Sequence, residues 1–339
     1  MDACVFYTFL KSNPDMNQLV KHLTIAPQDP SLGCLADLIP LVLTHKMETF
    51  RGSVNGNHFF KVLLSQTFGD EGMAKFKSLT TIPSAWNYSN VYDNLLHKLR
   101  YVLKEITLNF HRNPPGKAMK WPTLYRLNKM AQLQALTFNS YVHNVKQTEA
   151  ILKNCGRLEH LTIRLAVVGD LFGGEAKISQ WIEINTQQHD ILGTLKIRID
   201  KKYNPYFIDY LVYKYPNLKS ITVEKIDIEE PWGRTYSVMP LDINSIKDIL
   251  VKIEKVPSYT LVCKVLKSKV GKIIIALESN GYVVSKTNQS HAYSRITVTR
   301  SSSDRSIQDN ISRSTTHPAP LKVCCPCELN ESIKSLLQK

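Results

Sequence analysis

The residues with the clearest chemical potential lie near the C-terminus. Cys324, Cys325 and Cys327, together with His317, could supply the four ligands of a tetrahedral zinc ion. Their spacing differs from the paired Cys-x-x-Cys halves of common zinc sites, and adjacent cysteines fit awkwardly around one tetrahedral ion. We therefore predict a cysteine-rich tail that binds no metal, and a protein without a cofactor.

Familiar catalytic motifs are missing from the sequence. The glycine-containing stretch 169–174 lacks the Gly-Lys-Ser/Thr ending of a phosphate-binding loop. Neither a Gly-x-Ser-x-Gly elbow nor a His-Glu-x-x-His zinc motif occurs, and the histidines are scattered. Cys155 falls where a helix is expected to end, which favours a structural role. These observations predict a protein that is not an enzyme and has no small-molecule substrate.

The charge of the chain is strongly positive, with a formal net charge of +14. Such a charge favours acidic partners such as RNA or another acidic surface. However, the lysines and arginines are spread along the chain, without the run of about five or six like charges that marks a basic tail. A nucleic-acid footprint is usually clustered on one face, so RNA binding is the alternative hypothesis.

The N-terminus and the cysteines predict a cytoplasmic or nuclear protein. The first residues carry no basic leader ahead of an apolar stretch, so we expect no secretory signal. The seven cysteines are then expected to be reduced thiols. No apolar run reaches the roughly 20 residues that cross a bilayer, and we expect no membrane partner.

A short apolar phrase recurs along the chain and predicts the architecture. Its form is apolar-x-x-apolar-x-apolar, and the alternation is typical of a short strand with one buried face. The spacing centres on about 25–30 residues, the period of leucine-rich and similar stacked repeats. The clear copies span residues 20–25, 103–108, 133–138, 158–163, 192–197 and 218–223, and weaker copies span 47–52 and 76–82.

Stretches with helical spacing precede the phrases. Each has apolar residues at i, i+3 and i+4, which give one apolar stripe per helix. Gly156 is expected to end one helix in a left-handed conformation, and Pro216 to end another. The stretches span residues 35–42, 59–64, 91–99, 124–130, 178–182 and 207–211.

The repeating unit is therefore helix, break, strand. Stacking about eight such units predicts an α/β leucine-rich-repeat solenoid, with a curved parallel sheet on one face and helices on the other. We assign residues 1–240 to this solenoid, 241–299 to an α+β C-terminal cap and 300–339 to a mostly disordered tail. A longer connection at 168–175 is expected to carry an insertion or binding contacts.

The strand positions between the apolar ones are the candidate binding site, because successive side chains of a strand point to opposite faces. Threonine recurs there, and threonine also simply favours exposed strand positions. The charged neighbours are the stronger candidates for partner contacts. The predicted contact residues are Thr107, Asn109, Thr137, Asn139, Thr162, Arg164, Lys196, Arg198, Thr222 and Glu224.

The phrases at 158–163 (Leu-Glu-His-Leu-Thr-Ile) and 216–223 (Pro-Asn-Leu-Lys-Ser-Ile-Thr-Val) resemble the degenerate leucine-rich repeats of fungal F-box proteins. The resemblance covers residues 15–230. Residues 6–14, followed by 19–25, look like the segment that follows the F-box in such proteins.

This resemblance implies a substrate receptor. In the family, the F-box docks onto a Skp-type adaptor of a cullin ubiquitin ligase, and the repeats select the protein to be ubiquitinated. The Leu-Pro-x-Glu-like opening of an F-box is absent before the first repeat, so no ligase-binding residue is carried over. We therefore predict a non-enzymatic module that binds a protein partner, either a substrate or an adaptor.

Overall fold

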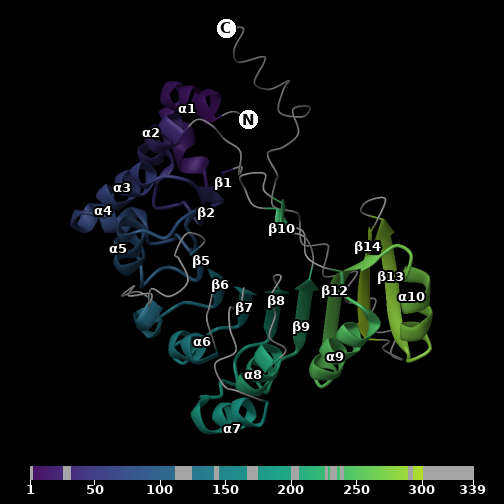
Figure 1. The fold of residues 1–339 in the computed structure, drawn as a ribbon. Helices are drawn as coiled ribbons and strands as arrows, with labels where there is room; N and C mark the ends of the chain where they lie inside the picture. Colours follow the sequence, from purple (N-terminus) through teal and green to yellow (C-terminus); the bar gives the residue numbers. More distant parts are fainter. Residues whose placement is uncertain are drawn as a thin grey trace.

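The computed structural model describes residues 3–25, 32–110, 124–140, 145–165, 175–199, 206–225, 228–229, 235–236, 240–288 and 293–300. They form a mixed α/β structure around a large, mostly parallel sheet of eight strands. Figure 1 shows a curved arrangement in which the strands follow the inner side and the helices the outer side.

The helices and strands have the following bounds. The helices are α1 (Ala3–Ser12), the 3-10 helix η1 (Pro14–Leu19), α2 (Leu32–Val42), α3 (Asn57–Ser65), α4 (Gly69–Lys75), α5 (Asn90–Lys98), the 3-10 helix η2 (Leu124–Lys129), α6 (Val145–Leu152), α7 (Glu175–Asn185), α8 (Tyr206–Lys214), α9 (Ile243–Ile253) and α10 (Val270–Glu278). The strands are β1 (His22–Thr24), β2 (Thr49–Arg51), β3 (Ser53–Val54), β4 (Ser84–Ala85), β5 (Glu105–Asn109), β6 (Ala135–Ser140), β7 (His160–Leu165), β8 (Thr194–Ile199), β9 (Ser220–Lys225), β10 (Ile228–Glu229), β11 (Thr235–Tyr236), β12 (Ser258–Leu266), β13 (Tyr282–Asn288) and β14 (Tyr293–Arg300).

The large sheet has the order β13-β14-β12-β9-β8-β7-β6-β5. From β5 to β9 each strand pairs in parallel with the next strand along the chain, and β12 continues the parallel series beside β9. The hairpin β13–β14 then joins antiparallel. The sheet therefore runs without a break across the predicted boundary at residue 240, and that boundary stays a prediction.

The N-terminal part repeats the same parallel arrangement with less regular pairing. Strands β1 and β2 are parallel neighbours. Single parallel bridges join Thr49 to Thr81 and Thr81 to Glu105, so Thr81 stands between β2 and β5. The weak phrase at 76–82 thus supplies two isolated bridges, both through Thr81, instead of the strand its pattern predicts.

The core follows from the alternation within each strand. The last two apolar positions of the phrase lie within the strands and face the helices, and in β5 to β9 these ten side chains are at most 1% exposed. Aligned across β5 to β9, they are Ile106, Leu136, Leu161, Leu195 and Ile221 in one row, and Leu108, Phe138, Ile163, Ile197 and Val223 in the next.

Local signals fix several helix ends. The Ser89 side chain accepts a hydrogen bond from the backbone N–H of Tyr92 at the start of α5. The Asp242 side chain accepts one from the backbone N–H of Ser245 at the start of α9. Helix α8 ends at Lys214, just before Pro216, as predicted. The prediction for Gly156 is wrong, because this glycine is not among the described residues with positive φ.

The remaining differences are local. The helix predicted at 124–130 is a 3-10 helix with a non-helical Arg126. Arg300, assigned to the tail, ends β14. The predicted disorder of 301–339, with His317 and the tail cysteines, and most of the 168–175 connection lie outside the described residues.

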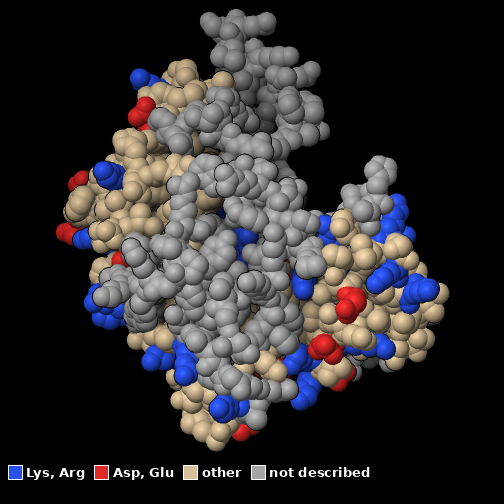
Figure 2. Space-filling model, viewed as in Figure 1, with Lys and Arg blue, Asp and Glu red and all other residues tan. Residues whose placement is uncertain are grey.

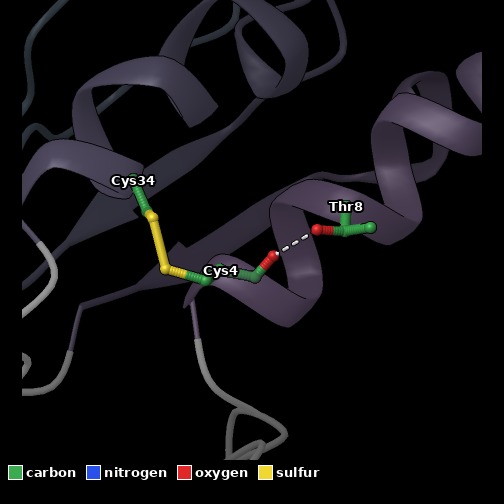
Figure 3. The surroundings of a disulfide bond; sticks show 3 residues. All are labelled: Cys4, Thr8 and Cys34. Atoms are coloured by element: carbon green, nitrogen blue, oxygen red, sulfur yellow. Dashed lines mark hydrogen bonds between the residues drawn. A yellow bond between two sulfur atoms is a disulfide. The ribbon is translucent and has the colours of Figure 1, made fainter.

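A disulfide joins the first two helices of the chain. Cys4 in α1 and Cys34 in α2 are bonded, with their Cα atoms 5.5 Å apart (Figure 3). Cys155 and Cys263 are free and buried. The prediction that all seven cysteines are reduced thiols is therefore wrong for Cys4 and Cys34, because the packing of α1 on α2 brings the two within bonding distance.

We expect the Cys4–Cys34 bond to stabilise the protein. It closes a loop with a sequence separation of 30, and the chain-entropy model gives about 3.6 kcal/mol for a loop of that length. Replacement Cys4→Ser should lower the free energy of unfolding in urea by about this amount under oxidising conditions. Dithiothreitol should lower the wild-type value similarly and leave the variant unchanged; equal wild-type values with and without reductant would contradict the prediction.

Candidate functional site

The ten predicted contact residues form two rows across the inner face of the sheet. The strand register aligns Thr107, Thr137, Thr162, Lys196 and Thr222 in one row, and Asn109, Asn139, Arg164, Arg198 and Glu224 in the other. Both rows alternate with the buried apolar rows, so these residues occupy the strand positions between the core positions. Their role in binding a partner stays a prediction.

At the β5 end of the second row, the side chains of Asn109 and Asn139 are fixed by amide hydrogen bonds. Asn139 Nδ2 donates to Asn109 Oδ1 at 2.7 Å, and Asn109 Nδ2 donates to the backbone oxygen of Ala85 at 2.9 Å. Asn109 is only 6% exposed. These contacts join β6, β5 and β4. They favour a structural role for Asn109 within the sheet over direct contact with a partner.

The other end of the second row is charged. Lys196 Nζ lies 2.7 Å from Glu224 Oε1, and Arg198 Nε donates to Glu224 Oε2 at 3.1 Å. The Glu224 side chain is only 12% exposed, whereas those of Lys196 and Arg198 are 33% and 43% exposed. One nearly buried carboxylate thus holds two cations that solvent can reach.

The ionisation of Glu224 depends on those two cations. Burial by itself would raise the pKa of the carboxyl, but the hydrogen bonds and positive charges of Lys196 and Arg198 outweigh it and hold the pKa below its ordinary value. Glu224 is therefore ionised at neutral pH and keeps both cations in place.

Sequence reasoning missed two extensions of this face. Arg51 Nη2 lies 2.9 Å from Glu105 Oε2, and this exposed pair spans from β2 to β5 across Thr81. At the other end, Thr260 and Val262 of β12 continue the rows beside Thr222 and Glu224. The alternation of β12 could have indicated this continuation, although its residues do not repeat the phrase.

A second group of polar residues lies buried on the helix side of the sheet. Lys214 Nζ, which is 0% exposed, lies 2.9 Å from Glu149 Oε2, and Tyr210 OH donates to the same oxygen at 2.6 Å. The backbone N–H of Gln187 donates to Glu149 Oε1, and Lys214 Nζ donates to the Gln187 carbonyl. This buried network joins α6, α8 and the connection after α7.

The chemistry of the buried network favours a structural role. Burial raises the pKa of the neighbouring Cys155 thiol to about 12, in spite of the positive charge of Lys214. A thiolate is the reactive form of cysteine, and Cys155 is protonated at neutral pH. Burial also raises the pKa of Tyr210 and lowers that of Lys214, against the opposing effect of Glu149.

Other kinds of site find little support in the part of the chain that the structure describes. No group of three or more His, Cys, Asp or Glu side chains there could hold a metal ion. A pocket of about 220 Å³ is lined by residues of η2, by Met130 and Leu133 that follow it, and by the turn after α6 with Cys155 and Arg157; none of the row residues lines it. Within the described helices, none is long and apolar enough to span a bilayer.

Comparison with known proteins leaves the family open. No protein-family model matches the chain, and a search of curated proteins finds no match.

The buried pair Glu149–Lys214 provides a stability test. Lys214→Met leaves a buried carboxylate without its cation and should cost about 3–5 kcal/mol of unfolding free energy. The double variant Glu149→Gln/Lys214→Met should recover much of that loss, because no buried charge remains. Urea unfolding measures both values.

The exposed pair Arg51–Glu105 is the matched control, with side chains 52% and 42% exposed. Arg51→Met should cost only about 0–1 kcal/mol. A similar loss for Lys214→Met and Arg51→Met would contradict the structural role of the buried network.

His189 should make stability depend on pH. Burial, followed by the charge of Lys214, lowers the pKa of His189 below its ordinary value of 6.5. The unfolded chain then binds a proton at His189 more readily than the folded protein does. The free energy of unfolding is therefore unaffected by this histidine above pH 6.5 and decreases as the pH falls below that value. His189→Gln should lose less stability than the wild type between about pH 7 and 5; parallel stability curves for the two proteins would contradict this.

Proposed function

We propose that this protein is a leucine-rich-repeat solenoid that binds a protein partner on the inner face of its sheet, without catalysis. The parallel strands follow one another in chain order from β5 to β9, and the connections carry helices on the outer side (Figure 1). This arrangement is the one expected when similar helix–strand units stack on their neighbours.

The observation that carries the proposal is the pair of polar rows. Five successive strands present Thr, Asn, Lys, Arg and Glu side chains in register on the side opposite the apolar core. A surface of this kind extends across several units, and extended inner surfaces are what solenoid proteins offer to partners.

A narrower form of the proposal makes the protein the substrate-recognition component of an F-box-type ubiquitin ligase. It is supported by the resemblance of residues 15–230 to the repeats of fungal F-box proteins. The repeats would then hold the substrate, and a Skp-type adaptor would be a second partner.

The distribution of charge supports a protein rather than RNA as the favoured partner. Figure 2 shows lysine and arginine side chains scattered over the visible face, on the N-terminal helices, the lower helices and the C-terminal part. In the described chain, cations lie both on the inner rows and on helices, as at Lys61, Lys98 and Lys247. A nucleic-acid footprint would be gathered on one face.

Affinity capture with a face-specific variant tests the proposal. Thr162→Arg places a bulky side chain in the middle of the inner rows, and Thr8→Arg makes the same change on the exposed side of α1. Proteins captured by the wild type, identified by mass spectrometry, should be lost with Thr162→Arg and kept with Thr8→Arg.

The outcomes separate the broad proposal from its narrower form. Identical captured proteins for all three baits would overturn binding at the inner face. Absence of a Skp-type adaptor among reproducible partners would remove the ligase role alone. Partners that disappear after ribonuclease treatment would favour RNA, whose phosphate contacts also make binding strongly dependent on salt.

A further inference from the structure

We propose that Arg198 and Lys196, positioned by Glu224, form a docking site for a carboxylate group in an acidic segment of the protein partner. This inference rests on the proposed function and deepens it, because it assigns a chemical preference to one part of the inner face. Its basis is the geometry of the three side chains on β8 and β9.

Glu224 occupies only one edge of the Arg198 guanidinium. The contact runs from Nε to Glu224 Oε2, and Lys196 takes the other carboxylate oxygen. Among the described residues, no other hydrogen bond or ion pair engages Arg198, so its two terminal amino groups remain available at a side chain that is 43% exposed. Two parallel N–H donors of this kind match the two oxygens of a carboxylate.

The contact with Glu224 also orients the guanidinium in advance. Glu224 is held in β9 by strand pairing on both sides, and its side chain is nearly buried. A planar guanidinium fixed at one edge has less conformational freedom to lose when its other edge binds a ligand. The depressed pKa of Glu224 keeps this anchor charged at neutral pH.

The local charge balance favours an acidic ligand. Two cations, Lys196 and Arg198, share the single carboxylate of Glu224, so this cluster has one more positive charge than negative. A carboxylate from an acidic segment of a partner would balance that excess charge.

The chemistry of the rows favours a protein over single-stranded nucleic acid. Sites for single strands combine basic residues with aromatic side chains on which bases stack. The ten row residues are Thr, Asn, Lys, Arg and Glu, and none is aromatic. A carboxylate of Asp or Glu therefore fits the surroundings better than a nucleotide phosphate.

Binding of a fluorescein-labelled decaglutamate peptide, followed by fluorescence anisotropy, tests the inference. The wild type should bind the peptide, and the affinity should fall between about 50 and 200 mM salt. Arg198→Lys keeps the charge but loses the paired donors, and should weaken binding about tenfold.

Arg51→Lys is the matched control. Arg51 also lies on the inner face and also pairs with a glutamate, but it uses a terminal Nη2 for that contact. This substitution should leave decaglutamate affinity within about twofold of the wild type. Circular dichroism and thermal unfolding of both variants should match the wild type.

Three outcomes would overturn the inference: no binding of decaglutamate by the wild type, equal losses in the two variants, or no loss in Arg198→Lys. Tighter binding of a labelled uridine decanucleotide, with the same loss in Arg198→Lys, would also overturn it in favour of nucleic acid. Capture that depends on Thr162 but is unchanged in Arg198→Lys would keep the proposed function while removing the acidic docking site.

Discussion

The structure depends on the burial of two apolar side chains from each strand against the helices behind the sheet. Leu161 and Ile163 of β7, for example, are 1% and 0% exposed. Because side chains alternate between the faces of a strand, a slip of one residue would turn both toward solvent and bring Thr162 and Arg164 into the core. Burial of the apolar rows therefore sets the polar rows of the inner face.

The same constraint explains why similar ion pairs have different roles on the two sides of the sheet. Behind the sheet, Lys214 is fully buried against Glu149, where an unmatched charge would be costly. On the inner face, Glu224 is nearly buried but Lys196 and Arg198 remain open to solvent. The buried network is suited to joining helices, whereas the inner-face cluster keeps donors that a partner can reach.

Local sequence patterns, namely apolar spacing and strand alternation, predicted much of the fold. Apolar spacing placed α2, α3, α5, α7 and α8, and strict alternation placed β5 to β9 with their buried faces. The failures concern weak local signals. Residues 124–130 have helical spacing but form a short 3-10 helix, and Gly156 avoids the left-handed conformation that a helix-ending glycine often adopts. Packing against neighbouring elements overrides such weak local preferences.

The sequence by itself determined which side chains face the core and which face the inner surface, because that choice follows from strand alternation alone. Only the tertiary structure decided which of these side chains contact one another. Arg198 and Glu224 are 26 residues apart, Arg51 and Glu105 are 54 apart, and Lys214 and Glu149 are 65 apart. Those encounters, and the Cys4–Cys34 bond, depend on strand register and helix packing, which arise from contacts between distant segments that no local pattern encodes.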